Sequence, residues 1–335
     1  MTVFSATARV VCNFNDPAVA SDRWTTLLRH GETDTVFLTW TWQRVWWEVF
    51  GRGQLLLVVV EREGEPIAIT PLFRDGGMVF FVSSGGSDYL EFIGDTSEEG
   101  VLEAILDAAR SEAEGFVGFR FYHLPDRSQT GKRLQRAAAA FGLACFDEGE
   151  LAAPVLEIQD PADALAAASK KSLLRHERGL AKSGALYTTH ICEPGAVREH
   201  LNAFFQQHID RWAATSSPSL FQDAAWRTFY TRLTEATDDV PWLRFTRVDW
   251  NERLIAFHFG FYYRGEYLWY KPTFDIALAR QSPGEVLLRQ LLLAAIDEGA
   301  RAFDFGLGEE SFKLRFATHV RHVRTWGLYP PEVVA

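Results

Sequence analysis

The sequence has few cysteines, and their spacing matches neither a metal site nor a disulfide framework. Its 335 residues include three cysteines, Cys12, Cys145 and Cys192, which lie far apart. This usage is typical of a reduced protein with isolated thiols. The nine histidines show no H-E-x-x-H pattern or comparable ligand spacing. We therefore predict no metal site.

Positive charge is also scarce. The chain carries 34 Lys and Arg against 44 Asp and Glu, a net charge of −10, with an isoelectric point near 5.4. General nucleic-acid binding depends on a basic surface, so this balance excludes it. Any anionic ligand must instead be bound by a local group of cationic side chains.

Long apolar segments and low-complexity tracts are missing too. The start, MTVFSATARVVCNF, lacks a basic segment followed by an apolar one, and runs such as 55–60 are too short to span a bilayer. We expect a cytoplasmic protein without a transmembrane segment, either a monomer or a homodimer, whose domains pack without a long linker.

Hydrophobic residues, at 47%, and aromatic residues, at 14%, are plentiful and form a weak internal repeat. They suffice for one large core or two ordinary ones, and two are favoured. Residues 60–73 and 248–261 each resemble a hairpin, and four of their apolar positions align at a constant spacing of 188 residues. A Trp-rich segment precedes each hairpin, and a third strand, a helix and a further strand follow it.

This order predicts a mixed α/β fold of two tandem domains, each a mostly antiparallel sheet flanked by helices. The predicted domains are residues 1–150 and 151–335, with a junction at 148–162. The predicted elements in the two halves are Trp-rich segments at 40–50 and 224–233, third strands at 78–84 and 266–272, helices at 98–114 and 282–298, and last strands beginning at 116 and 302.

The segment QSPGE predicts a helix start. Ser282 suits the cap, Pro283 the first helical position, and Glu285 the end of a capping box. The same start, with Gly284 in its first turn and Arg280 before it, presents unpaired backbone N–H groups and a cation to an anion. The residues leave both interpretations open, a plain helix start and a socket for a phosphate.

Several motifs stand out along the chain: WW in the first half, SDYLEFIG, KKSLLRHERGLAKSG and, most specific, SPGEVLL with AIDEGARAFDFGLGEESFK. Together they resemble the GNAT-fold acyltransferases of the CelD/BcsL group, relatives of the FemABX peptidyltransferases. The resemblance implies two GNAT-like domains, a degenerate first one on the acceptor side and a catalytic second one. It implies direct transfer from acetyl-CoA or another acyl-CoA to an amine or hydroxyl of a small-molecule, sugar, peptide or envelope-precursor acceptor.

In such a site the fourth strand splays from the fifth, and the pyrophosphate rests on the loop that opens the next helix. The usual loop, Q/R-x-x-G-x-G/A, is only partly retained, which leaves the donor open between acyl-CoA and aminoacyl-tRNA. The first-half loop, IGDTSEEG, is acidic and would repel a pyrophosphate, so we expect nucleotide binding in the second half alone. The implied cofactor-binding residues are Lys271, Arg280, Gln281, Ser282, Pro283 and Gly284.

Direct transfer needs a proton acceptor and a donor for the leaving thiolate. On a strand, Glu309 and Glu310 would face opposite sides, and the family pattern favours Glu310 as the base, although a solvated acidic turn is the alternative. Tyr270 is the candidate donor to the thiolate, or else an aromatic of the sheet surface. His258 is a second candidate base, or a core histidine.

Three further observations concern charged residues. Asp304, a further catalytic candidate, interrupts an apolar strand and either faces water or is buried beside a partner such as Lys313 or Arg315. A structural pairing is favoured over a catalytic role. By resemblance Lys313 would bind a substrate phosphate, unless it is an ordinary surface lysine. Arg175 and Arg178 form, with Lys182, a helical stripe that is either a solvated face or a site for an anionic acceptor or an RNA acceptor stem.

Two alternatives to the acyl-CoA enzyme remain. One is an aminoacyl-tRNA-dependent transferase, which the basic helix favours and the acidic net charge disfavours. The other is a non-catalytic CoA-sensing or scaffold protein of a polysaccharide assembly, in which the degenerate loop has lost turnover.

Overall fold

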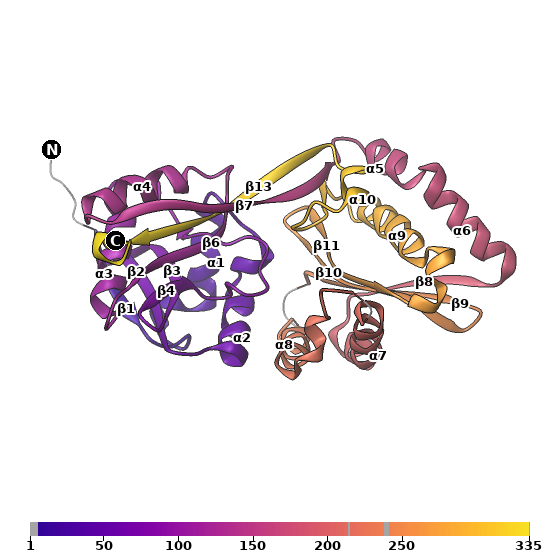
Figure 1. Ribbon diagram of the computed structural model, residues 1–335, viewed down its shortest axis with the longest axis horizontal. Coiled ribbons are helices and arrows are strands. Elements are labelled where there is room, and N and C mark those ends of the chain that lie inside the picture. Colours follow the sequence, from indigo (N-terminus) through magenta and orange to yellow (C-terminus); the bar gives the residue numbers. More distant parts are fainter. Residues whose placement is uncertain (1–5, 214, 238–240, 335) are drawn as a thin grey trace. The chain divides into compact units, whose positions relative to one another are not determined.

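The computed structural model describes residues 6–213, 215–237 and 241–334, and the chain divides into two compact units (Figure 1). Unit 1 takes the chain up to Ala152 and from Arg321 onward, and unit 2 takes Ala153–Val320. The predicted second domain includes residues 321–335. They lie in unit 1 because β13 (His319–Tyr329) pairs with β6 (Gly118–Pro125). Residues 1–5 and 335 of the predicted domains lie outside the described residues.

Unit 1 is built on a sheet with the strand order β1-β2-β3-β4-β6-β13-β7. The pairs β1–β2, β2–β3, β3–β4 and β6–β13 are antiparallel, and β4–β6 is parallel. Its elements are β1 (Thr7–Val11), α1 (Ser21–His30), α2 (Trp40–Phe50), β2 (Gln54–Arg62), β3 (Glu65–Asp75), β4 (Met78–Phe81), β5 (Ile93–Gly94), α3 (Val101–Glu112), β6, α4 (Thr130–Ala140), the first part of β7 (Ala144–Glu157), β13 and α11 (Pro331–Val334).

Unit 2 contains the strand order β7-β12-β11-β10-β9-β8. Here β11–β12 is the parallel pair, and the pairs β7–β12, β11–β10, β10–β9 and β9–β8 are antiparallel. Its elements are α5 (Pro161–Ala168), α6 (Lys171–Ser183), β8 (Leu186–Ile191), α7 (Pro194–Trp212), α8 (Ala224–Glu235), β9 (Leu243–Trp250), β10 (Arg253–Tyr263), β11 (Glu266–Phe274), η4 (Ile276–Gln281), α9 (Pro283–Asp297), β12 (Ala302–Asp304) and α10 (Ser311–Leu314).

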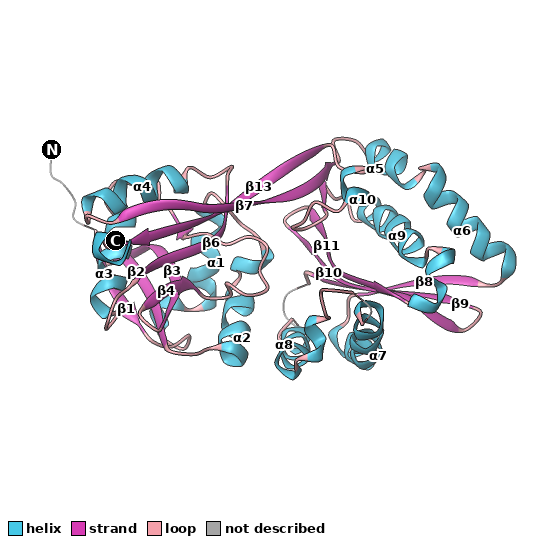
Figure 2. Cartoon of the chain, viewed as in Figure 1, coloured by secondary structure: helices cyan, strands magenta, loops and turns pink. Residues whose placement is uncertain are grey.

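Helices cover both faces of the sheet in unit 2 (Figure 2). α9 contributes Leu287 and Leu291 to a core that includes Ala256 of β10. On the other face the Phe204 ring of α7 packs edge to face against the Phe257 ring, with 6.1 Å between the ring centres. The sheet is therefore sandwiched, and only the ends and edges of its strands are open to a ligand.

The two hairpins of the predicted repeat have turns with the same backbone conformation. Glu63 and Gly64 have φ values of 53° and 83°, and Asn251 and Glu252 have values of 49° and 64°. Positive φ at both central residues is typical of the two-residue turn whose twist matches that of its flanking strands. Both units then continue with a third strand, a helix and a parallel strand. The prediction of a mixed, mostly antiparallel α/β fold with this repeat is confirmed.

The predicted junction at 148–162 is largely strand. Residues up to Glu157 belong to β7, the longest strand among those described. In unit 1, Glu148 accepts a hydrogen bond from Tyr329 of β13 at 2.5 Å. In unit 2, the end of β7 pairs with β12 through Val155 and Asp304. The irregular hydrophobic period of this stretch thus reflects a strand whose two ends have different surroundings.

Candidate functional site

The candidate site lies where two parallel strands of unit 2 separate. β11 and β12 pair only over Glu266–Leu268 and Ala302–Asp304. β12 ends at Asp304, whereas β11 continues to Phe274 with β10 along its other edge. The far half of β11 therefore has an edge without a β12 partner among the described residues. The backbone of such an edge can bind an extended ligand that carries amide groups.

The loop after β11 leads directly to the start of α9. Asp275 opens it by accepting the N–H of Ala277 at 2.9 Å, which caps η4. Arg280 and Gln281 follow and are exposed, and Pro283 takes the first position of α9. The first N–H groups of a helix lack carbonyl partners within it, and the helix dipole favours an anion there. The predicted cofactor residues of this loop thus gather at one helix start.

The predicted capping box is wrong. Ser282 has φ 54° and ψ 53°, in the left-handed region, and its side chain makes no capping bond. A capping side chain normally requires extended backbone at this position. Glu285 does not complete a box either, because its carboxylate lies 2.7 Å from Nδ1 of His176 and 3.6 Å from the Arg315 guanidinium. These contacts draw the one carboxylate of the first turn toward α6 and Arg315.

Gly284 brings the start of α9 close to the end of β11. A Cβ atom at this position would lie 3.2 Å from Cδ1 of Phe274, closer than ordinary van der Waals contact. The missing side chain therefore lets the first helical turn approach the last residue of β11. The open strand edge and the helix start are consequently neighbours.

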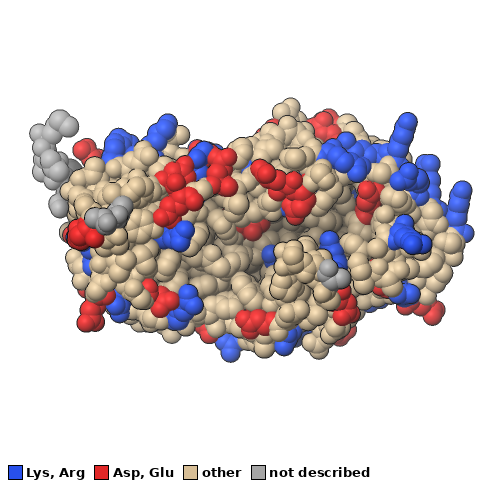
Figure 3. Space-filling model, viewed as in Figure 1, with Lys and Arg blue, Asp and Glu red and all other residues tan. Residues whose placement is uncertain are grey.

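The basic helix α6 packs beside this loop and contacts both η4 and α9. Leu173 and Leu180 bury its apolar side, and Glu177 accepts a bond from Arg289 of α9 at 2.9 Å. The stripe of Arg175, Arg178 and Lys182 is exposed on the other side. Lys and Arg side chains gather over α6 at the upper right of the surface in Figure 3.

The turn after β12 holds three predicted site residues. Asp304 is buried, and its carboxylate accepts the N–H of Gly306 at 2.8 Å. Lys313 is also buried, donates to the Leu307 carbonyl at 2.7 Å and forms an ion pair with Glu310 at 2.8 Å. Lys313 is therefore not an ordinary surface lysine. The Glu310 side chain, by contrast, is 56% exposed.

The expectation that Glu309 and Glu310 alternate across a strand is wrong. The strand ends at Asp304, and both glutamates lie in the exposed loop before α10. β12 pairs with β7 over Ala302–Asp304 alone, and the backbone then turns at Gly306, which has a φ of 68°. Glu310 remains distinct from Glu309 through its ion pair with Lys313.

Tyr270, Lys271 and His258 lie on β11 and β10. Tyr270 and His258 are both buried, and the Tyr270 N–H donates to Nε2 of His258 at 3.2 Å. The Lys271 Nζ lies 4.0 Å from the centre of the Tyr270 ring. Burial lowers the pKa of His258 to about 3, so its ring is neutral near pH 7.

In unit 1 the corresponding gap, between β4 and β6, is occupied by segment 87–94 of the protein. β4 and β6 pair only over Met78–Phe80 and Gly118–Arg120, and segment 87–94 follows beside them. Its Leu90 N–H donates to the His123 carbonyl of β6 at 3.1 Å. The Phe92 ring lies 5.0 Å from that of Phe81 and 5.2 Å from that of Phe121. A ligand would have to displace this buried segment.

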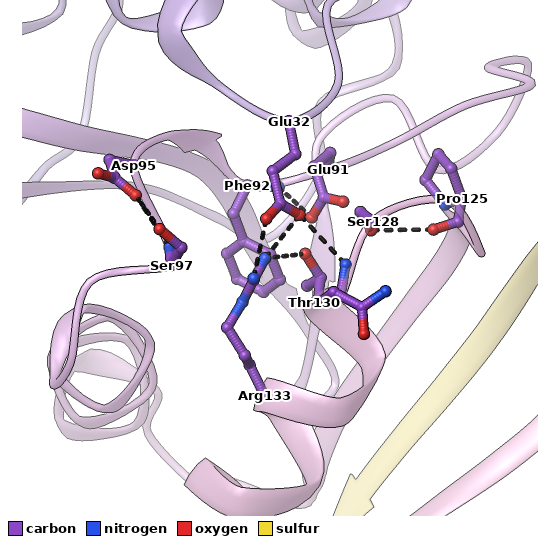
Figure 4. Close-up of polar contacts among 10 residues, drawn as sticks. Glu32, Glu91, Phe92, Asp95, Ser97, Pro125, Ser128, Thr130 and Arg133 are labelled. Atoms are coloured by element: carbon purple, nitrogen blue, oxygen red, sulfur yellow. Dashed lines mark hydrogen bonds and ion pairs between the residues drawn. The ribbon is translucent and has the colours of Figure 1, made fainter.

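The same segment contains a buried carboxylate that the sequence analysis missed. Glu91 is 1% exposed, its Oε1 accepts the Phe92 N–H at 3.0 Å, and the Ser128 and Thr130 side chains also hydrogen-bond to its carboxyl group. Figure 4 shows it beside Ser128, Thr130 and the pair Glu32–Arg133. Burial raises the pKa of Glu91 to about 7. The available signal was one Glu within the apolar run YLEFI.

The described ranges contain no group of three or more His, Cys, Asp or Glu residues arranged to hold a metal ion. Within the same ranges, no helix is both long enough and apolar enough to cross a membrane.

Comparison with protein families identifies a domain within unit 2. Residues 167–314 match the family described as acetyltransferase (GNAT) domain. This range includes β11, the start of α9, β12 and Lys313. The part of the chain that forms the candidate site is therefore similar to a GNAT domain. No curated protein matches the sequence.

Solved structures extend the likeness to almost the whole chain. FemX is 12% identical with a TM-score of 0.66, over 92% of this chain and 95% of FemX. L-PGS from Bacillus licheniformis is 14% identical with a TM-score of 0.56, over 96% and 93%. A tandem GNAT protein from the clavulanic acid biosynthesis pathway is 14% identical with a TM-score of 0.54, over 97% and 99%. At these identities the likeness establishes a tandem GNAT-like fold.

Proposed function

We propose that the protein transfers an acyl group from acetyl-CoA or another acyl-CoA directly to an amine or hydroxyl of a small-molecule, sugar or peptide acceptor. The observation that carries this proposal is the separation of β11 from β12 next to the uncapped start of α9. The edge of β11 beyond its pairing with β12 suits the amide-containing pantetheine arm, and the helix start suits the pyrophosphate.

Unit 2 would bind the donor. Arg280, Gln281 and the Gly284 N–H would bind the pyrophosphate, and Lys271 on β11 is assigned to the acyl end. Ser282 and Pro283 would shape the turn, because the Ser282 N–H donates to the Ala279 carbonyl at 3.1 Å and proline has no N–H. Unit 1 would not bind a nucleotide, since segment 87–94 fills its gap and Asp95 stands exposed at the segment's end. We assign unit 1 to the acceptor side of the reaction.

The chemistry requires a balanced proton transfer. The acceptor nitrogen or oxygen bonds to the acyl carbon, the C–S bond breaks, Glu310 takes the acceptor's proton, and the Tyr270 hydroxyl gives its proton to the departing thiolate. Glu310 suits the first role because it is an exposed carboxylate in the loop that follows β12. Asp304 and Lys313 would hold the turn that carries it. His258 is buried and already bonded to backbone, which leaves Glu310 as the better base.

The acceptor is proposed to carry negative charge. Arg175 and Arg178 are exposed on α6, which packs against η4 and the start of α9. Lys313 already has two partners, so we assign it to holding Glu310 and the turn. We therefore propose that the arginines of α6, and not Lys313, bind an anionic group on the acceptor.

An aminoacyl-tRNA-dependent transferase is the second candidate, because the α6 stripe and the likeness to FemX favour it. Calorimetry with acetyl-CoA, longer acyl-CoAs and charged tRNA separates the two, followed by a free-thiol assay against amines and sugars. The acyl-CoA proposal expects CoA binding and thiol release that depends on an acceptor. Binding of charged tRNA without CoA binding would reverse the choice. CoA binding without thiol release would favour a CoA-sensing protein.

A further inference from the structure

β11 carries an extra residue near the point where it leaves β12. Phe259 pairs with Lys271 and Phe261 pairs with Leu268, so Trp269 and Tyr270 together lie opposite Gly260 alone. Two residues against one is a β-bulge, which bends the strand and changes the direction of its side chains. The bulge follows directly after Leu268, the last residue of β11 that pairs with β12.

The side chain of His258 lies within this bulge. Its Nε2 accepts the Tyr270 N–H at 3.2 Å, and its ring stacks 5.6 Å from that of Trp269. A Cβ atom on Gly260 would lie 2.0 Å from Cε1 and 2.4 Å from Nε2 of His258. Gly260 is therefore needed so that the imidazole can reach the bulge amide. The bond satisfies a buried N–H within the bulge.

His258 can hold this bond throughout the neutral pH range. Burial lowers its pKa to about 3, so the ring stays uncharged and keeps one nitrogen as an acceptor. Nδ1 has no hydrogen-bond partner among the described residues, and the Leu268 carbonyl also interacts with the ring. Nε2 is therefore the ring nitrogen that contacts the bulge.

The bulge places two neighbouring side chains on one face. In a regular strand, Tyr270 and Lys271 would point to opposite faces. Here the Tyr270 ring packs 5.4 Å from Phe261 and 6.4 Å from Tyr230 of α8, and the Lys271 Nζ lies 4.0 Å from the Tyr270 ring centre. A phenol and an ammonium group are thereby brought together beside the open edge of β11.

We propose that His258 is a positioning residue, which holds the β11 bulge so that Tyr270 and Lys271 act together on the departing thiolate. The inference rests on the proposed acyl transfer. The ammonium of Lys271 would favour the negative charge that forms on sulfur, and the Tyr270 hydroxyl would supply the proton. His258 itself touches neither the donor nor the acceptor.

The test compares His258→Leu, which removes the acceptor, with His258→Gln, whose amide oxygen can replace Nε2. Tyr267→Phe serves as the control, since Tyr267 is equally buried and stacks 6.4 Å from His258 without bonding to the bulge. The assay measures thiol release from acetyl-CoA, with kcat and KM determined separately, at equal concentrations of folded protein. Hydrogen exchange of the Tyr270 amide, followed by NMR, is measured on the same proteins.

We expect His258→Leu to lower kcat by about 10- to 100-fold with little change in KM for acetyl-CoA, because misplaced groups lose transition-state contacts. Exchange of the Tyr270 amide should accelerate at least about 10-fold. His258→Gln should restore most of both, and Tyr267→Phe should change neither. Equal losses in the Leu and Gln variants, or unchanged amide exchange in the Leu variant, would overturn the inference.

The two readouts separate this inference from the proposed function. If the wild-type protein binds acetyl-CoA but releases no thiol, the acyl-transfer proposal fails. Amide exchange would then still decide whether His258 holds the bulge. If thiol release is normal in His258→Leu while exchange is fast, the bulge is held by His258 but does not serve catalysis.

Discussion

Replacing Glu91 with Gln should remove a pH dependence from the stability of the protein. The Glu91 carboxyl is buried in unit 1, and burial raises its pKa from 4.5 to about 7. Between these values the folded state keeps a proton that the unfolded state has released. Stability contributed by this group is therefore complete below pH 4.5 and is lost as the pH rises toward 7.

The loss follows from the two pKa values. Each pH unit between them lowers the free energy of unfolding by about 1.4 kcal/mol, so the total is about 3 kcal/mol. Glutamine has nearly the same shape and cannot ionise. Relative to wild type, Glu91→Gln should therefore gain about 3 kcal/mol between pH 4.5 and pH 7.5, even if it is less stable at the acidic end.

Denaturant unfolding at several pH values, monitored by tryptophan fluorescence and circular dichroism, measures this difference. Glu99→Gln is the matched control, because Glu99 lies eight positions later and is exposed. Its curve should run parallel to that of wild type. Parallel curves for Glu91→Gln as well would refute the reasoning, since they would mean that Glu91 ionises as easily in the folded protein as in the unfolded chain.

Three other predictions concern unit 2. Arg280→Glu should weaken CoA binding by about 10- to 100-fold in calorimetry, the size of a charge-assisted contact, while Asp95→Asn in unit 1 leaves it unchanged; equal effects would place nucleotide in both units. Glu310→Gln should lower turnover by about 100-fold with acyl-CoA still bound, and an active variant with an unchanged pH profile would exclude Glu310 as the base. Lys313→Met should destabilise the protein by about 1 to 3 kcal/mol, because Lys313 is buried and bonds to the Leu307 carbonyl. A variant of full stability but raised KM for a phosphate-bearing acceptor would return Lys313 to substrate binding.

The repeated order of strands and helices could be predicted because it depends on local pattern. Alternating apolar residues around the two-residue turns at 63–64 and 251–252 indicate hairpins wherever they occur. The apolar face of 287–295 likewise indicates a buried helix after a loop. These signals lie within short windows of sequence, and the structure has the corresponding elements.

The details of the site could not be predicted, since they depend on contacts between distant residues. Glu285 fits a capping box locally, yet it is drawn to His176, 109 residues away. Its local sequence suggests that Lys313 is a surface residue, but Lys313 is buried and donates to the Leu307 carbonyl of the preceding turn. Glu91 differs from an exposed strand residue only because segment 87–94 fills a gap between β4 and β6, which no local pattern indicates.

The return of β13 to unit 1 has a consequence for how the chain can fold. During synthesis the first 152 residues emerge together, but the partner that pairs with β6 arrives only with residues 323–328. Until then one side of β6 is an unpaired strand edge, which invites pairing with other chains. A fragment that stops before β13 should therefore aggregate more readily than the full chain, and unit 1 is expected to reach its native state only after unit 2 has been made.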